Sequence, residues 1–206
     1  MKILKNTIFR GIALLQTAGF VLTLSGCLHD NPMDTELQKA QISGDVVQSD
    51  IGPIHILASD SKLQSLLKEA SRDSLLRSER LIKADEGGGI KISDDLLGHI
   101  QIKFKRDDLL EDTNIKLQWL GTESGDSRLY SLECLPHGTE FNNPVKIEVS
   151  YRGADLTGVN ESKLRIFYAN PTTGLWEFIG GEVDTENKIV TAYLNHFSRY
   201  AVAWSN

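Results

Sequence analysis

The sequence has few of the residues and motifs that identify an enzyme or a metalloprotein. Only two cysteines, Cys27 and Cys134, occur in 206 residues, so there is no disulfide framework. The five histidines stand far apart, and none has the spacing of a zinc site. The sequence also contains no EF-hand loop, phosphate-binding loop, dinucleotide fingerprint or nucleophile elbow. We therefore expect no metal and no cofactor, and a core held by apolar packing.

Basic residues are the minority. The chain has 22 Lys and Arg against 28 Asp and Glu, a net charge of −6. Lys2, Lys5 and Arg10 belong to the N-terminal segment, and removing it leaves 19 cations against 28 acids, a net charge of −9. A domain this acidic should repel nucleic acid and anionic head groups. We expect no nucleic-acid partner.

No apolar run is long enough for a permanent membrane span. The stretch from Gly11 to Leu24 is interrupted by Gln16 and Thr17, and it is shorter than the roughly 18 to 20 apolar residues that a span needs. It follows a basic start and ends in small residues, which is the order of zones in a secretory signal. Residues 1–26 are predicted to be a signal peptide that is cut between Gly26 and Cys27.

The end of this segment, Leu24-Ser25-Gly26-Cys27, resembles the lipobox of bacterial lipoproteins. The resemblance implies that the Cys27 thiol receives a diacylglycerol and that its new amine is acylated, for example with palmitate. Two or three acyl chains hold a protein stably on a bilayer. Leu28 stands where an Asp would retain an enterobacterial lipoprotein in the inner membrane. The resemblance therefore implies a lipid-anchored protein of the cell envelope, at the outer membrane.

Two segments separate this anchor from the rest of the chain. Residues 27–61 are polar, with Pro32 and Pro53, and predict a tether in which Val46-Val47 and Ile54–Leu57 leave a short added strand possible. Residues 62–86 carry leucines at three- and four-residue steps as far as Lys83, which predicts one amphipathic helix that ends at the glycines from Gly87.

From Ile90 onward the apolar period falls to two. Val145, Ile147 and Val149 alternate with Lys146, Glu148 and Ser150, a pattern typical of a strand with one buried and one wet face. Strands are predicted at 90–92, 100–104, 115–119, 129–135, 145–151, 164–168, 175–179, 189–194 and 197–204. Nine such strands with no helical pattern between them favour a mostly β fold, an antiparallel β-sandwich.

Several short motifs occur in this region: Gly87–Ile90, Leu135-Pro136-His137-Gly138-Thr139, Phe141, Pro144-Val145, Trp176-Glu177 and His196-Phe197-Ser198-Arg199-Tyr200. Together they resemble the ZU-five type domain, which occurs in zonula occludens proteins, netrin receptors, ankyrins and bacterial surface proteins. The resemblance assigns residues 87–206 to this domain and implies a β-sandwich used for protein contacts. One departure is Lys105–Asp108, where the family has a proline-glycine turn.

The same resemblance offers one catalytic alternative, because some relatives cut themselves within the triplet His196-Phe197-Ser198. The Ser198 hydroxyl, activated by His196, would attack the Phe197 carbonyl, and water would then cleave the ester. This reaction requires a strained peptide. Alternatively, Phe197 is a core side chain between two polar edge residues.

Three weaker candidates each have a structural alternative. The acidic pairs Asp94-Asp95, Asp107-Asp108 and Glu111-Asp112 are interpreted as solvated turns in preference to calcium ligands. Aromatic residues on strands could stack on sugar but are more typical of a core; they are Trp119, Trp176, Trp204, Tyr130, Tyr151 and Tyr168. Cys134, in an apolar strand, is expected to be an inert thiol.

The sequence as a whole predicts a lipid-anchored protein with no enzymatic activity, which serves as a protein-interaction or structural module with an unknown protein partner. Self-cleavage between Phe197 and Ser198 is one alternative, and carbohydrate binding is another.

Overall fold

The computed structural model describes residues 46–60, 76–124 and 127–205. The predicted signal peptide, Cys27 and residues 62–75 of the predicted helix lie outside this part of the chain. Within it, no helix is both long enough and apolar enough to cross a membrane.

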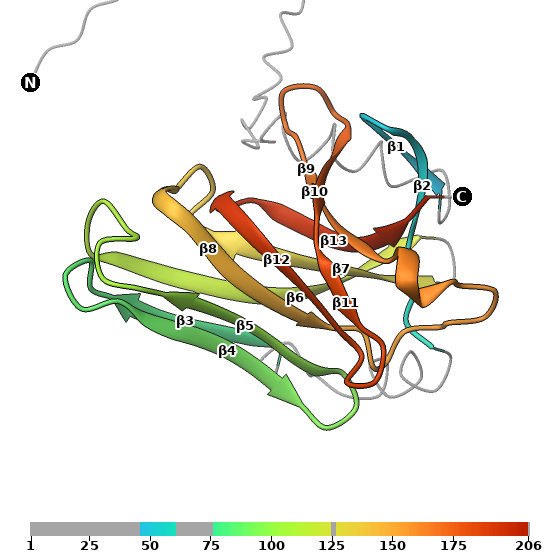
Figure 1. The fold of residues 1–206 in the computed structure, drawn as a ribbon, viewed down its shortest axis with the longest axis horizontal. Helices are drawn as coiled ribbons and strands as arrows, with labels where there is room; N and C mark the ends of the chain where they lie inside the picture. The colour runs from blue at the N-terminus through green and yellow to red at the C-terminus, as the bar shows by residue number, and fades with distance from the viewer. Residues whose placement is uncertain (1–45, 61–75, 125–126, 206) are drawn as a thin grey trace, which may run out of the picture. The chain divides into compact units, whose positions relative to one another are not determined.

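The described residues form thirteen strands and one short 3₁₀ helix (Figure 1). The strands are β1 (Val46–Ser49), β2 (Gly52–Ile56), β3 (Arg77–Ile82), β4 (Gly88–Asp94), β5 (Gly98–Phe104), β6 (Thr113–Ser124), β7 (Ser127–Leu135), β8 (Glu140–Ser150), β9 (Arg165–Ala169), β10 (Trp176–Gly180), β11 (Glu182–Asp184), β12 (Ile189–His196) and β13 (Arg199–Trp204). The helix η2 is Glu161–Lys163. The predicted mostly β fold class is confirmed, and each of the nine predicted strands overlaps an observed strand, with differences of one or two residues at four of their ends.

The strands form two sheets. One has five strands in the order β11-β12-β8-β5-β4, and the other has eight in the order β2-β1-β10-β9-β13-β7-β6-β3. A single apolar core lies between them, since buried residues of both sheets, such as Ile102 and Leu117, belong to one cluster. Every pairing is antiparallel except that of β1 with β10.

The count of about nine strands is too low, because it leaves out β1, β2, β3 and β11. Part of the larger sheet also closes on itself. β2 pairs with both β1 and β13, so β2, β1, β10, β9 and β13 form a closed ring of five strands. Figure 1 shows β1 and β2, drawn in blue, beside strands from the orange and red end of the chain. The ring has its own small core, which includes Trp176, Phe167 and three alanines. Closure removes free edges from these strands.

Strands β9 and β13 are buried on both faces as a result. Tyr200 and Val202 face the core between the sheets, whereas Ala201 and Ala203 face the inside of the ring. The small alanine side chains suit the narrow ring, because small residues let strands approach around a bulky Trp176. This explains the nearly continuous apolar run at the end of the chain.

The predicted helix is wrong over Arg77–Ile82, which is strand β3. Its residues pair in unbroken antiparallel register with β6, from Arg77 opposite Gln118 to Ile82 opposite Thr113. Ile82 is buried and Leu81 is 56% exposed, so the two neighbours face opposite sides as a strand requires. Tertiary pairing overrides the local helical spacing here. Likewise, β1 and β2 lie inside the predicted tether, at the two apolar patches where an added strand was left open.

Candidate functional site

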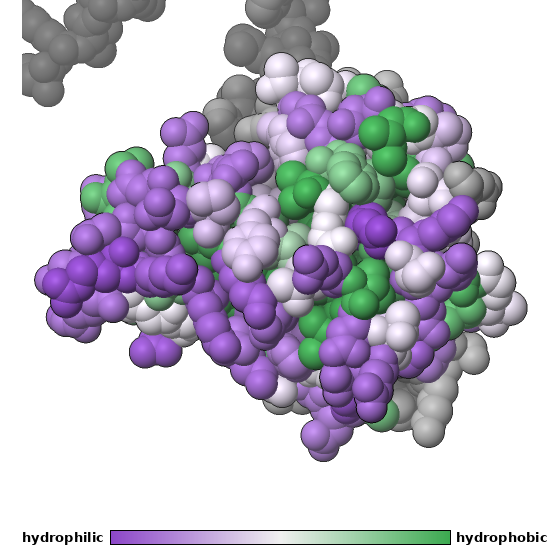
Figure 2. Space-filling model, in the orientation of Figure 1, coloured by the Kyte–Doolittle hydropathy of each residue, from purple (hydrophilic) through white to green (hydrophobic). Residues whose placement is uncertain are grey.

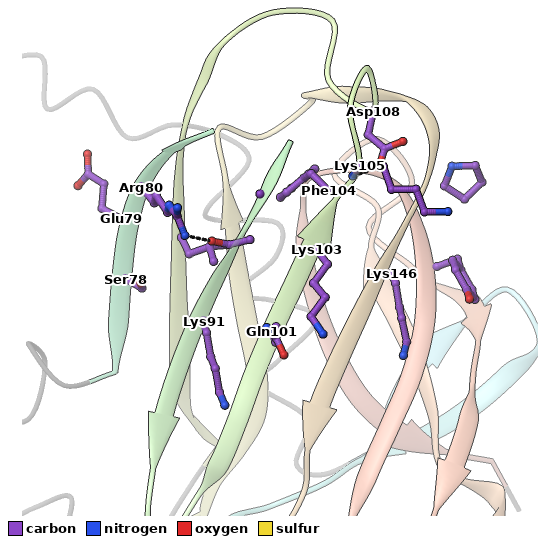
Figure 3. A pocket seen from close by; sticks show the side chains of 15 residues that line it. Ser78, Glu79, Arg80, Lys91, Gln101, Lys103, Phe104, Lys105, Asp108 and Lys146 are labelled. Carbon is purple, nitrogen blue, oxygen red and sulfur yellow. Dashed lines mark hydrogen bonds between the residues drawn. The ribbon is translucent and has the colours of Figure 1, made fainter. Parts of the chain in front are cut away.

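A groove runs along the outer face of the five-stranded sheet and reaches the edge strand β3. It has a volume of about 890 Å³. We call it the basic groove after its cationic lining residues, Arg80, Lys91, Lys103, Lys105 and Lys146. Figure 3 shows Lys91, Lys103 and Lys146 extended from three neighbouring strands on one side of the sheet. Figure 2 shows hydrophilic residues over the side of the molecule that holds β3, β4 and β5.

Strand register brings these side chains together. Lys103 on β5 lies opposite Lys146 on β8, and Lys146 lies opposite Tyr193 on β12. The neighbouring row holds Lys91 and Gln101. Each of these residues alternates with a buried neighbour, such as Ile102 beside Lys103, so burial of one face fixes the groove side chains on the other.

The carboxylates near the groove are already engaged. Glu79 accepts a hydrogen bond from Asn114 and lies 3.4 Å from Lys116 Nζ. Asp108 accepts the backbone N–H of Lys105 at 2.6 Å. Within the described residues, neither Lys91 nor Lys103 forms an ion pair with a carboxylate within 4 Å, although the charge of Lys103 helps to lower the pKa of Glu148. The groove is therefore a positively charged surface on an acidic protein.

On the sheet face, the carboxylate of Glu148 bonds the side chain of a groove lysine. Its Oε1 accepts a hydrogen bond from Lys146 Nζ at 2.7 Å. This bond lowers the pKa of Glu148, against the opposing effect of partial burial, and it raises the pKa of Lys146. Burial and the charge of Lys91 lower the pKa of the nearby His99. One carboxylate thus offsets only part of the positive charge.

Tyr193 joins the basic groove to two smaller hollows. One, of about 620 Å³, continues towards Lys105 and Arg106, and the other, of about 470 Å³, continues towards Gly181 and Glu182 on β11. Tyr193 lines all three and is 60% exposed. Sequence reasoning missed this residue, although its place between the apolar Ala192 and Leu194 marks it as facing outward.

The structure does not bring His196 and Ser198 together. Ser198 is buried and its Oγ donates to the Ala169 carbonyl at 3.4 Å, whereas His196 Nδ1 lies 3.3 Å from the Tyr200 hydroxyl. No hydrogen bond between His196 and Ser198 is present in the described part of the chain. The self-cleavage reaction stays a prediction. In the structure Ser198 bonds the Ala169 carbonyl and His196 lies beside the Tyr200 hydroxyl.

Phe197 sits between these two residues as a core side chain. It is 1% exposed, and its ring packs edge-on against Phe141 and Phe104, with centroids 4.9 and 6.0 Å away. Its N–H donates to the Thr139 carbonyl and its carbonyl accepts from the Gly138 N–H, both at 2.9 Å. Its backbone has neither a cis bond nor a positive φ. These contacts fit the structural alternative for the triplet.

Carboxylates of the acidic pairs accept hydrogen bonds from backbone N–H groups in turns. Asp94 Oδ1 accepts the backbone N–H groups of Leu96 and Leu97, and Asp112 Oδ1 accepts that of Ala84 at 2.9 Å. Among the described residues, no group of three or more His, Cys, Asp or Glu side chains could hold a metal ion.

Most of the aromatic residues considered for a sugar-stacking platform are core residues, as the preferred structural interpretation expects. Trp119, Trp176, Tyr130 and Tyr151 are buried, because their strand positions face a core. The partly exposed Trp204 stacks on His55 with centroids 5.0 Å apart. Cys134 is fully buried, and burial raises the pKa of its thiol, so it has the environment of an inert thiol.

Comparisons with known proteins add little to this description. No family model matches the chain. A stretch of 58 residues, 28% of the chain, is 36% identical to part of an amylopullulanase from Thermoanaerobacterium thermosulfurigenes. The chain spans only 3% of the length of that protein.

Proposed function

We propose that this chain is a lipid-anchored protein of the cell envelope, with no catalytic activity, that binds an anionic partner in the basic groove. A ZU-five type β-sandwich over residues 87–206 and the lipid on Cys27 are parts of this proposal. Its main support is the group of lysines Lys91, Lys103 and Lys146 on the outer face of the five-stranded sheet.

Repulsion between neighbouring lysines lowers the stability of the folded sheet. Lys103 and Lys146 lie directly opposite each other on adjacent strands, and like charges in that position destabilise a sheet. A carboxylate at either position would pair with the lysine that remains. Glu148 offsets part of this repulsion through its bond to Lys146, and an anionic partner would supply further negative charge, which gives the lysines a role in binding.

The environments of Cys134, Ser198 and His196 support a non-catalytic role. Cys134 is buried with a raised thiol pKa, and Ser198 and His196 have separate partners. The groove presents lysines, Arg80, Gln101 and Tyr193, together with Ser78 and Glu79 at β3. This set can bind and orient an anion, and the Glu79 carboxylate contacts Asn114 and Lys116.

The amylopullulanase likeness bears on a second candidate, carbohydrate binding. That protein is named for its carbohydrate substrates, and the exposed ring of Tyr193 favours a sugar ligand independently of the likeness. The shared stretch is too short a part of that enzyme to bring its activity to this chain.

Two polyanions test the groove: poly-L-glutamate and polygalacturonate, each titrated into the detergent-solubilised full chain. Both should bind, and binding should weaken as salt is raised. Lys103→Glu should reduce affinity about fivefold or more, since it removes one ion pair and adds a repulsion. Lys163→Glu on η2 makes the same charge change away from the groove and should leave binding unchanged. Equal losses in the two variants, or no binding of either polyanion, would contradict the proposal.

The anchor is tested by Cys27→Ser. The unaltered protein should float with membranes and give a mature mass that includes acyl chains. The variant should remain unprocessed or be released. A processed variant that still floats with membranes would refute the lipid anchor while leaving the groove proposal intact.

A further inference from the structure

We infer that the anionic partner of the basic groove is a polysaccharide, a linear chain of sugars that carries carboxylate or phosphate groups. This inference rests on the proposed function and gives the class of ligand. It depends on the exposed ring of Tyr193, on the continuity of the hollows around that ring, and on the burial of Ile90 and Phe104 in the floor of the groove.

Tyr193 supplies a flat apolar surface within a row of cations. Its side chain is 60% exposed and stands opposite Lys146, which in turn stands opposite Lys103. An aromatic ring can stack on the C–H face of a sugar, while neighbouring lysines pair with the acidic groups of that sugar or the next. Gln101, in the adjoining row of the groove, can exchange hydrogen bonds with hydroxyls. An anionic sugar uses all three kinds of side chain.

The hollows form a track. Tyr193 lines the basic groove and the two hollows on either side of it. Together they cross the sheet from β4 to β11, and four strand spacings make about 19 Å. A small anion would occupy one point of this track, whereas a linear polymer can follow it and contact several lysines at once.

The floor of the groove argues against an acidic protein as the occupant. Ile90 and Phe104 line it, but they are only 2% and 5% exposed. Protein interfaces depend on an apolar centre into which large side chains are buried. Here the exposed lining consists mostly of charged side chains, with Pro144 and Tyr193 as its exposed apolar groups. Single-stranded nucleic acid is also disfavoured, because successive bases need successive aromatic rings.

The test compares an anionic glycan with an anionic peptide of equal charge. Polygalacturonate and poly-L-glutamate are titrated calorimetrically into the detergent-solubilised full chain and into Tyr193→Ala. We expect the polygalacturonate affinity to fall about two- to tenfold in the variant, because ring stacking is lost, and the polyglutamate affinity to stay within about twofold. Phe178→Ala is the matched control, since Phe178 is also exposed, at 44%, but lies on β10 outside the groove. It should change neither affinity.

Dextran phosphate and oligothymidylate complete the set of probes. Dextran phosphate that binds more tightly than polygalacturonate would assign phosphate-bearing sugars, and weaker binding would assign carboxylate-bearing ones. Tighter binding of polyglutamate, or equal loss of both polymers in Tyr193→Ala, would overturn the glycan assignment in favour of an acidic protein. Tightest binding of oligothymidylate would overturn it in favour of nucleic acid. If no polyanion binds, the proposed function itself fails.

Discussion

Phe197→Ala should destabilise the fold severely, and the structure sets the size of the effect. The side chain is 1% exposed and fills the space between Phe141 and Phe104. Removing a buried Phe costs about 3–5 kcal/mol. The upper part of that range applies, because hydrogen bonds to Thr139 and Gly138 hold the backbone on both sides of the residue and limit collapse into the cavity.

Urea unfolding followed by tryptophan fluorescence measures this loss. With a denaturant slope of about 2 kcal/mol per M, a loss of about 4 kcal/mol lowers the midpoint by about 2 M. The melting temperature should fall by about 8–16 °C. Phe178→Ala is the control, because its ring is 44% exposed, and it should cost about 1 kcal/mol.

Phe197→Leu distinguishes the loss of side-chain volume from the loss of the aromatic ring. It retains an apolar side chain of similar size and should cost less than Phe197→Ala, by about 2 kcal/mol. If Phe197→Ala shifted the midpoint by less than about 0.5 M, the ring would not be an element of the core. The triplet would then have no structural explanation.

Three further predictions concern the charge network, the self-cleavage alternative and a tight turn. Burial alone would raise the pKa of Glu133, but His137 and Arg199, whose Nη2 lies 3.1 Å away, outweigh it and lower that pKa. The folded carboxylate therefore adds stability that is present above about pH 4.3, the ordinary value, and that is lost as the pH falls through the lowered pKa. Glu133→Gln should flatten the fall in unfolding free energy below pH 4.3, and an unaltered fall would refute this assignment. The purified chain should keep its full mass over days at 37 °C, with Ser198→Ala identical to it, whereas a break that Ser198→Ala prevents would establish the self-cleavage alternative. Gly98→Ala should lower stability by about 2 kcal/mol or more, because φ is +82° and a Cβ would lie 2.2 Å from Oγ of the buried Ser150; an unchanged melting temperature would contradict this.

Local patterning predicted the strands where one face is buried and the other is wet. β4, β5, β8 and β12 all alternate in this way, and a period of two is visible within a single segment. β3 was missed because Leu81 and Ile82 also continue the helical spacing of the preceding leucines and because its partner β6 lies more than 30 residues away. Only pairing with that strand distinguishes the two conformations.

The basic groove was invisible for a similar reason. Lys103, Lys146 and Tyr193 belong to three segments, each with an ordinary polar residue on a wet face. The negative net charge did not suggest an anion-binding surface, because the acidic residues spread over the whole chain outnumber the lysines on this face. The outward position of each side chain could be predicted, but their meeting in one row could not.

The sequence by itself determined the strand-rich fold class, the apolar residues of the core and the prediction of a lipid anchor at Cys27, because each depends on neighbouring residues. The tertiary structure alone decided the closure of β2 onto β13, the strand conformation of β3 and the row of lysines beside Tyr193. These features arise from register between distant segments, and register is set by which buried faces pack together.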